Sequence, residues 1–226
     1  MNQPSAAVTL RSLVLTTLLA MAPLAWGLSP KPPSIEASSY ILLDHQTGDV
    51  LAEQNPDAPL PPASIVKVMT LYVAFDEISK GHISLDDEVL ISEKAWRATG
   101  SRSFVEVGSR VRLEDLLHGI VIQSGNDASV AVAEHIAGDE SVFAQLMNTH
   151  AARIGMEDAH FTNASGLPHP EMVASARDIA LLSQALIRDF PEFYTWFGEK
   201  EFVYNDSIRS TKNFSATYVF CLNYNF

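Results

Sequence analysis

The sequence predicts an α/β protein in which an all-helical lobe is inserted between strands. Two strand patterns joined by the turn at 45–48 precede a helix with a single charged residue between Pro61 and Phe75, and four further helical patterns follow in the middle of the chain. A hydrophobic content of 47% with 19% charged residues is typical of a globular protein. We therefore expect the 226 residues to form one domain, or one domain with a small subdomain.

The N-terminus has the features of a secretory signal. A single arginine precedes the apolar run from Leu13 to Ala25, and a small-x-small triplet ends at Gly27. An uncleaved anchor is the alternative, but the run is short for a bilayer span and Pro23 interrupts it. We expect a signal peptide over 1–27, a Pro-rich spacer over 28–37, and export to the periplasm or cell envelope.

Charge and cysteine content exclude several classes of protein. The net charge of −12, with no cluster of Lys and Arg to offset it, argues against a nucleic-acid partner. Cys221 is the single cysteine, so an intrachain disulfide is impossible. No Cys/His cluster has metal-ligand spacing, and the sequence predicts neither a metal nor another cofactor.

The first strands are predicted at 38–44 and 49–54, and a Pro-rich loop at 55–62 leads into the apolar helix. Between Pro61 and Phe75 the only charged side chain is Lys67, and apolar residues cover every face of a 3.6-residue helix. Such a helix belongs in the centre of a domain. The prolines suit a helix start, which places Ser64 in the first turn.

Ser64 and Lys67 together suggest nucleophilic catalysis. Three residues apart on a helix, the amine can reach the hydroxyl, and burial should lower the pKa of the lysine until it can accept a proton. A serine needs such a base, and the helix N-terminus favours a developing oxyanion. A bare Ser-x-x-Lys occurs about once by chance in a chain of this size. However, Lys67 is the one charge in an otherwise apolar helix, and this context favours a functional motif over a chance occurrence.

The remaining chain is predicted to be mainly helical. A short strand at 86–91 and a hairpin at 101–111, with its turn near Gly108, come first, and 161–170 is a loop. Ser175 and Asp178 have the spacing of a capping box. The helical patterns, separated by Gly or Pro signals, cover 112–122, 127–136, 141–154 and 176–188.

Gln123-Ser-Gly-Asn126 interrupts two of these helices. The hydroxyl of Ser124 could relay a proton, and the amide of Asn126 could donate to a substrate carbonyl and hold a lysine in place. The alternative is structural, in that Ser124 and Gly125 end one helix and Asn126 caps the next. Taken alone, this motif favours the structural interpretation.

The two motifs together resemble those of the penicillin-binding protein and serine β-lactamase superfamily. Pro-Ala-Ser-Ile-Val-Lys-Val-Met-Thr, Gln-Ser-Gly-Asn-Asp-Ala, His-Phe-Thr-Asn-Ala-Ser-Gly-Leu-Pro-His-Pro and Ser-Ala-Arg-Asp-Ile-Ala are similar to the low-molecular-mass D-alanyl-D-alanine carboxypeptidases. The resemblance runs from about Tyr40 to Asn213. It implies the sheet of that superfamily with its inserted helical lobe.

The resemblance also implies roles for four residues. Ser64 would be the acylated nucleophile, Lys67 its base, Ser124 the group that passes a proton to the leaving D-alanine, and Asn126 a contact to the substrate amide carbonyl. The substrates would be peptidoglycan pentapeptide stems, and β-lactams would inhibit by acylating Ser64. The family needs no metal or cofactor.

A β-lactamase is the nearest rival. The common serine β-lactamases have a Glu-x-x-x-Asn loop and usually Ser-Asp-Asn as their second motif. Here Glu157 and Glu171 are followed four residues later by Phe161 and Ser175, and residue 125 is glycine. These differences disfavour the rival.

The sequence departs from the family pattern at its C-terminal end. It contains no Lys-Thr-Gly, the family's third motif, and residues 214–226 carry no charge. We expect 38–213 to be an incomplete catalytic domain without its C-terminal strands or membrane-anchoring helix, the reading frame having shifted or stopped near Asn213. Low stability and little peptidase activity are expected, because loss of an oxyanion donor costs roughly 10² to 10³ in rate. A catalytically silent envelope protein that binds peptidoglycan or β-lactams is the alternative function.

Overall fold

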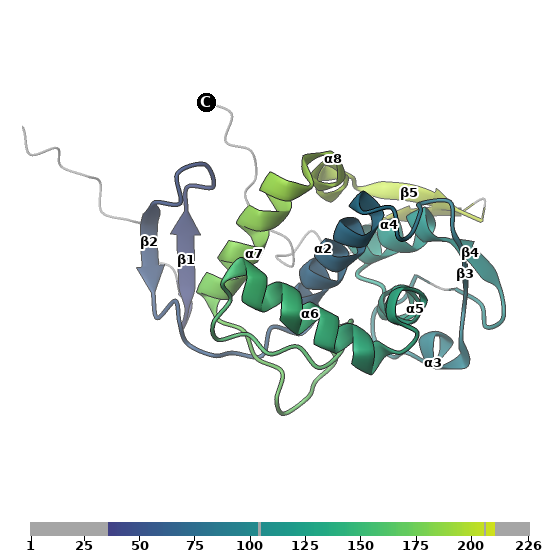
Figure 1. Ribbon diagram of the computed structural model, residues 1–226, viewed down its shortest axis with the longest axis horizontal. Helices are drawn as coiled ribbons and strands as arrows, with labels where there is room; N and C mark the ends of the chain where they lie inside the picture. The colour runs from purple at the N-terminus through teal and green to yellow at the C-terminus, as the bar shows by residue number, and fades with distance from the viewer. Residues whose placement is uncertain (1–35, 104, 206, 211–226) are drawn as a thin grey trace, which may run out of the picture. The chain divides into compact units, whose positions relative to one another are not determined.

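A computed structural model describes residues 36–103, 105–205 and 207–210. The chain divides into two units, residues 1–36 and 37–226, and all described helices and strands belong to the second unit (Figure 1). Several predicted features lie outside the described residues: the signal peptide, most of the Pro-rich spacer, the departure near Asn213 and the uncharged tail.

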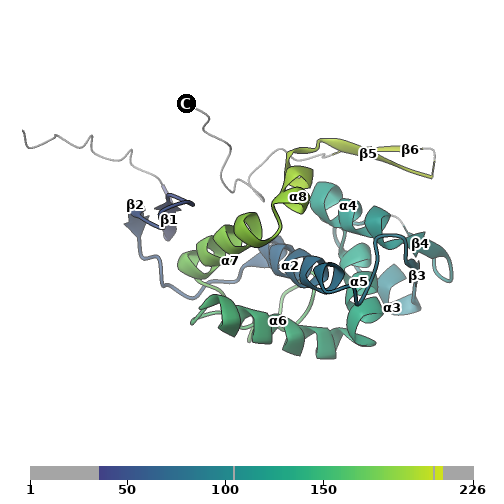
Figure 2. The same ribbon diagram turned by 45° about the horizontal axis from the view of Figure 1, so that its top comes forward.

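Helix α2 (Val66–Ser79) follows a single 3-10 turn, η1 (Ala63–Ile65). Its first eleven residues are all buried, and it contacts α4, α5, α6 and α7, which surround it in Figures 1 and 2. A helix enclosed in this way has no solvent-facing side, which explains why apolar residues occur on every face of it. The predicted central helix is confirmed.

The four helices of the predicted lobe and its continuation are confirmed to within one or two residues. They are α4 (Leu113–Gln123), α5 (Asn126–Ala137), α6 (Glu140–Ile154) and α7 (Ala176–Asp189). Three short helical segments accompany them: α3 (Glu93–Trp96), α8 (Pro191–Tyr194) and η2 (Thr195–Gly198).

Local sequence signals set the ends of these helices. The predicted capping box is present at the start of α7, where the Asp178 N–H donates to Ser175 Oγ at 3.1 Å and the Ser175 N–H donates to Asp178 Oδ2 at 2.9 Å. Helix α6 ends at Gly155, whose φ of 89° lies in the left-handed region that glycine tolerates best. Both ends therefore follow from residues next to the helix.

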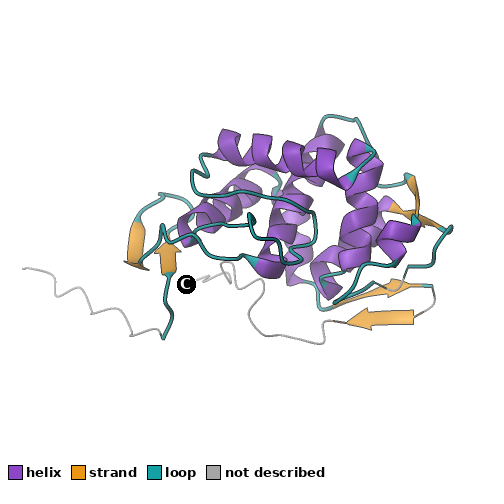
Figure 3. Cartoon of the chain, turned by 90° about the horizontal axis from the view of Figure 1, so that it is seen from below, coloured by secondary structure: helices purple, strands orange, loops and turns teal. Residues whose placement is uncertain are grey.

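The strands form three separate antiparallel pairs among the described residues, drawn in orange in Figure 3. Strands β1 (Tyr40–Leu43) and β2 (Val50–Gln54) make the predicted first hairpin, and β1 contacts α7. Leu42 and Leu51 of this pair expose more than half of their surface.

The predicted hairpin at 101–111 is wrong. Strand β4 (Arg110–Arg112) pairs with β3 (Glu88–Leu90), with Val89 opposite Val111. The turn signal at Gly108 is real, because a turn does precede β4. However, the Gly108 N–H donates to the carbonyl of Ile91, the residue after β3, so this turn does not join two paired strands. The pairing partner lies about twenty residues earlier, beyond the range over which turn residues specify a hairpin.

A third hairpin, β5 (Glu201–Tyr204) with β6 (Ser207–Ser210), lies beside α4 in Figure 2 and was not predicted. Its register pairs Phe202 with Arg209 and Val203 with Ile208. No Gly or Pro marks the turn between the two strands, because Asn205 adopts the positive φ of the connection instead.

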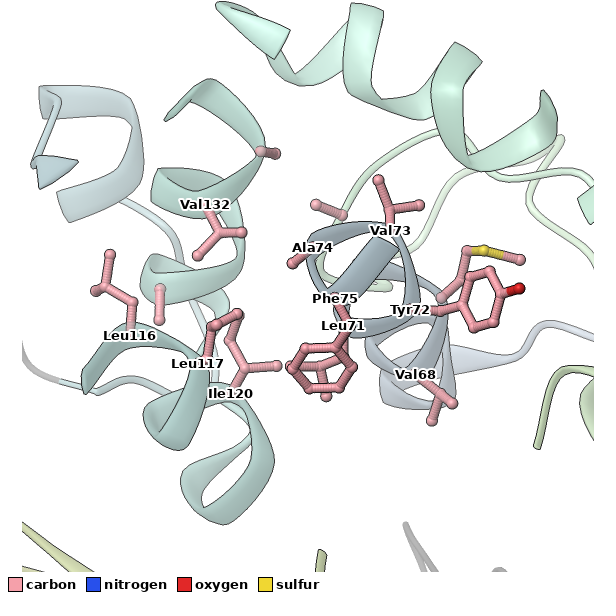
Figure 4. Packing of buried hydrophobic residues seen from close by; sticks show 14 of the residues in the cluster. Val68, Leu71, Tyr72, Val73, Ala74, Phe75, Leu116, Leu117, Ile120 and Val132 are labelled. Atoms are coloured by element: carbon pink, nitrogen blue, oxygen red, sulfur yellow. The ribbon is translucent and has the colours of Figure 1, made fainter. Parts of the chain in front are cut away.

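The hydrophobic core is centred on the contact of α2 with the α4–α5 pair. Figure 4 shows Leu117 and Ile120 of α4 facing Leu71 and Phe75 of α2, and all four side chains are fully buried. Burial of such a side chain stabilises the fold by roughly 1.5 to 3 kcal/mol. The Ser-x-x-Lys motif, which begins in η1 and ends in α2, is therefore attached to a helix that the core encloses.

None of the helices in the described ranges is both long enough and apolar enough to cross a membrane.

Candidate active site

Ser64 lies in the 3-10 turn that opens into α2. Pro62 precedes this turn, and its carbonyl accepts a hydrogen bond from the Ile65 N–H at 3.1 Å. Ala63 has a φ of 47°, in the left-handed region that alanine rarely adopts. Such a conformation persists only where the surroundings impose it, and it is often found beside functional groups.

Lys67 is fully buried one helical turn above Ser64. Its Nζ lies 3.4 Å from Ser64 Oγ and donates a hydrogen bond to the Ser165 carbonyl at 2.5 Å. Burial lowers the pKa of Lys67 from 10.5 to about 8, against the opposing attraction of the Asp127 carboxylate. The direction of this shift is the one that the sequence predicted, and it keeps a usable fraction of the amine neutral near pH 8.

The loop at 161–170 supplies the carbonyl that holds the lysine. Within this loop Asn163 Oδ1 accepts hydrogen bonds from the Ser165 and Gly166 N–H groups at 3.2 and 2.8 Å, and Asn163 Nδ2 donates to the Leu167 carbonyl at 3.0 Å. Thr70, one turn beyond Lys67, donates through Oγ1 to the Ala164 carbonyl at 2.7 Å. The loop is therefore anchored both internally and to α2.

Gly166 packs directly against the start of the helix. Its φ is 80°, and a Cβ at this position would overlap the Ala63 carbonyl. The close approach of the two backbones explains why residue 166 is glycine. The residue that Gly166 contacts, Ala63, is also the one with the positive φ. The sequence placed this loop in the family motif but gave no reason for its contact with Ser64.

Ser124 and Asn126 lie at the junction of α4 and α5, both of which contact α2. Ser124 ends α4 with a φ of 54°, so its structural role is as predicted, but its Oγ is buried and makes no hydrogen bond to the described residues. Asn126 does not cap α5, because Gly125 takes that position and Asn126 Nδ2 donates to the Thr99 carbonyl at 2.6 Å. Its Oδ1 is likewise buried without a hydrogen bond to this part of the chain.

These two oxygens distinguish the junction from an ordinary helix connection. Buried polar atoms normally have a partner, so an unpaired hydroxyl and an unpaired amide oxygen at one junction are available to a ligand or water. The structure shows no hydrogen bond between Ser124 and Lys67 among the described residues, whereas it brings Ser64 and Lys67 into contact. The left-handed φ of Ser124 adds local strain of the kind that functional positions carry.

Asp127 belongs to the same region and was not singled out from the sequence. It is completely buried, and its Oδ1 accepts hydrogen bonds from the Ser103 N–H at 2.7 Å and the Ala128 N–H at 2.9 Å. Arg102 Nε lies 3.7 Å from its Oδ2. The carboxylate thus holds the loop before β4 against the α4–α5 junction. Asp127 stands among polar residues in the sequence, so no signal comparable to the isolated charge of Lys67 marked it.

The opposite end of α2 carries a second cluster of ionisable groups. Asp76, Glu77 and His150 bring possible metal-ligand atoms within 4.8 Å of one another. However, Lys80 Nζ lies 2.5 Å and Arg153 lies 3.2 Å from the Asp76 carboxylate. Side-chain cations already neutralise these acids, which indicates a structural ion-pair network.

A serine hydroxyl beside a buried, partly neutral lysine at a helix start is the arrangement of a serine acyltransferase or hydrolase. Comparison with known sequences identifies the family within this class of enzymes. Residues 27–222 match the model of the peptidase S11 family, described as D-alanyl-D-alanine carboxypeptidase, and the chain belongs to that family.

Individual relatives agree with this assignment. D-alanyl-D-alanine carboxypeptidase DacA of Escherichia coli (strain K12) is 39% identical over 229 residues, which cover 94% of this chain and 57% of that protein. Penicillin binding protein 6B of Escherichia coli has a TM-score of 0.78 at 38% identity, over 83% of this chain and 61% of that one. Penicillin binding protein 5 of Haemophilus influenzae has a TM-score of 0.77 at 38% identity, over 80% and 54%.

The structural likeness establishes the α/β fold of these penicillin-binding proteins for the described residues and confirms the predicted fold class. The chain spans about half the length of the curated relatives it matches, 57% and 47% for two carboxypeptidases of Escherichia coli.

Proposed function

We propose that the chain carries the acylation site of a serine D-Ala-D-Ala carboxypeptidase, with Ser64 as the nucleophile and Lys67 as its base. The observation that supports this most directly is the 3.4 Å separation of Lys67 Nζ and Ser64 Oγ, combined with a lysine pKa of about 8. An amine of that pKa within reach of a hydroxyl suits general-base catalysis near neutral pH.

The proposed reaction has two stages. Neutral Lys67 accepts the proton of Ser64, whose oxygen attacks the carbonyl carbon of the penultimate D-alanine, and N–H groups at the start of α2 favour the developing oxyanion. Ser124 passes a proton to the amine of the leaving D-alanine, while Asn126 contacts the substrate amide carbonyl. Water then hydrolyses the ester on Ser64. The unpaired oxygens of Ser124 and Asn126 support these two roles.

The proposed substrates are peptidoglycan pentapeptide stems, and β-lactams are the proposed inhibitors. The second proposal is consistent with the two structural relatives described above, both of which are named penicillin binding proteins. Both ligands lie outside the cytoplasm, which agrees with the export expected from the N-terminal sequence. The net charge of −12 gives no electrostatic attraction for nucleic acid.

Mass spectrometry of the intact chain after incubation with a penicillin tests the proposal. The expected result is a covalent adduct that Ser64→Ala abolishes and that Ser79→Ala, at the far end of α2, retains. An adduct at equal yield in the Ser64→Ala chain would overturn the assignment of the nucleophile. A peptide ending in D-Ala-D-Ala then distinguishes turnover, which releases D-alanine, from binding alone.

A further inference from the structure

An apolar pocket of about 400 Å³ lies beside the candidate nucleophile. It is formed by two separate loops, one leading into Ser64 and one following the Asn163 turn. Its volume falls within the range of about 300 to 1,000 Å³ that is usual for small-molecule sites. Its larger apolar lining residues are Pro61, Pro62, Leu167, Pro168, Pro170 and Met172.

Prolines in its lining and backbone hydrogen bonds beside it make the pocket rigid. Four of its lining residues are prolines, whose fixed φ restricts both loops. Two pairs of backbone hydrogen bonds connect the chain on either side of it: Leu60 with Ala174 at 3.1 and 3.0 Å, and His160 with Val173 at 2.9 and 3.2 Å. A preformed pocket loses little conformational freedom when a ligand enters, so its binding energy is retained.

The lining selects for apolar groups. Pro62 and Met172 are buried beneath it, Leu167 is half-buried, and the exposed prolines form its rim. It contains no carboxylate, ammonium or guanidinium group, and His169 is its one ionisable side chain. A charged ligand group would lose its hydration here without gaining a partner, whereas an aliphatic or aromatic group loses only its contact with water.

The pocket is directly connected to the start of α2. Ala63, covalently bonded to Ser64, is part of its lining, and so is Gly166, which packs on the Ala63 carbonyl. Leu167, the residue after Gly166, lies two positions beyond Ser165, whose carbonyl holds Lys67. The wall of the pocket is thus continuous along the backbone with both the candidate nucleophile and the carbonyl that holds its base.

We propose that this pocket is a specificity subsite that binds an apolar side chain on the acyl portion of the group transferred to Ser64. The proposal rests on the proposed function, because it assumes that Ser64 is acylated. It makes Leu167 and Met172 specificity-determining residues, and it predicts that acyl donors with a larger uncharged, apolar substituent near the reacting carbonyl are favoured over those with a small one.

Two penicillins that differ only in the acyl side chain, acetyl and phenylacetyl, test the proposal on the full chain. The rate of adduct formation, followed by intact mass, is expected to be about tenfold or more higher for phenylacetyl, since apolar pockets discriminate by roughly 10- to 200-fold for small changes. Leu167→Ser should bring this ratio toward one. Leu85→Ser, at a half-buried leucine in a turn remote from the pocket, should leave the ratio unchanged.

The proposal is overturned if the ratio is near one in the unmodified chain, or if Leu167→Ser leaves it intact. Failure of acylation itself is a separate result, so the same two penicillins are also titrated noncovalently against Ser64→Ala and Ser64→Ala/Leu167→Ser by ligand-observed NMR. The phenylacetyl compound should bind more tightly only when Leu167 is present. Equal affinities for both compounds in the Ser64→Ala chain would exclude the subsite even if no adduct forms.

Discussion

The charged residues at the two ends of α2 lie in opposite electrostatic environments. At its start, Lys67 is fully buried, and within the described residues its contacts are a hydroxyl and a carbonyl, with no ion pair. At its other end, Asp76 is surrounded by Lys80, Arg153 and His150 at 2.5, 3.2 and 3.5 Å. The Lys67 ammonium therefore has no ion-pair partner in the described chain, whereas two cations, Lys80 and Arg153, neutralise the Asp76 carboxylate.

The difference separates a reactive group from a structural one. Burial lowers the pKa of Lys67 toward neutrality. Burial acts to raise the pKa of Asp76, but the hydrogen bond from Lys80 and the nearby His150 and Arg153 outweigh it and lower that pKa. Ion pairing thus fixes Asp76 in its charged form, whereas Lys67 can exchange its proton. We expect substitutions at the two ends to have opposite effects on activity and stability.

Lys67→Met should have the largest effect. Loss of the general base should reduce the rate of acylation by about 10²- to 10⁴-fold. The same change removes a buried ammonium, whose pKa shift corresponds to roughly 2 to 4 kcal/mol, so the free energy of unfolding at pH 7 should rise. Adduct kinetics and urea denaturation measure the two effects.

Lys80→Met is the matched control for this variant, because it removes the same charge from the paired end of α2. It should leave acylation unchanged and should not stabilise the chain. If Lys67→Met lowered stability as much as activity, the lysine would be a structural residue.

Ser124→Gly should reduce acylation by roughly a hundredfold, the lower part of the range for lost proton transfer. Because glycine tolerates the φ of 54°, the free energy of unfolding should be unchanged or rise by up to about 1 kcal/mol. Asn205→Gly, at an exposed residue of similar φ, controls for the backbone effect. Equal acylation in the two glycine variants would remove Ser124 from the reaction.

The pH dependence of acylation should follow Lys67. Only the neutral amine accepts a proton, so the rate should rise about tenfold per pH unit below pH 8 and level off above it. Stability should respond in the same window. Below pH 8 the lysine is protonated in both the folded and the unfolded chain, so the full cost of burying its charge is present.

This cost diminishes between pH 8 and 10.5, because the folded chain has released the proton and the unfolded chain still binds it. Relative to Lys67→Met, the unmodified chain should therefore gain stability across that interval. A difference that stays constant from pH 7 to 10 in urea titrations would contradict the lowered pKa.

Asp76→Asn should have the smallest effect. Removal of the carboxylate leaves Arg153 and Lys80 without their shared anion, but both cations are half-exposed, so a loss of roughly 1 to 2 kcal/mol in the free energy of unfolding is expected. The acylation rate should stay within about twofold of the unmodified chain. A hundredfold loss of acylation would show that the two ends of α2 are coupled.

Some residues of the site could be predicted from the sequence, and others could not. Ser64 and Lys67 were predictable because a helix places residues three apart on one face. The Ser165 carbonyl that holds Lys67 was not, because it lies 98 residues away along the chain and enters through loop packing. Asp127 was not predicted either, because it stands among polar residues at a helix start, where a carboxylate is common as a favourable dipole partner.

The fold shows the same division between local and distant signals. Helix bounds and the capping box at Ser175 follow from neighbouring residues and were predicted closely. The pairing of β3 with β4 depends on a partner that no turn signal near Gly108 identifies, so a local hairpin was predicted wrongly. The pocket beside Ser64 combines two loops about a hundred residues apart, and the sequence could give only their proline content.

The most direct test of the account is a titration of Lys67 itself. NMR of the chain with ¹³Cε-labelled lysine, with Lys67→Met to assign the signal, reports the midpoint at which this amine loses its proton. The account predicts a midpoint near pH 8, more than two units below that of an ordinary lysine. A midpoint near 10.5 would mean that Lys67 stays charged at neutral pH and cannot be the base that activates Ser64.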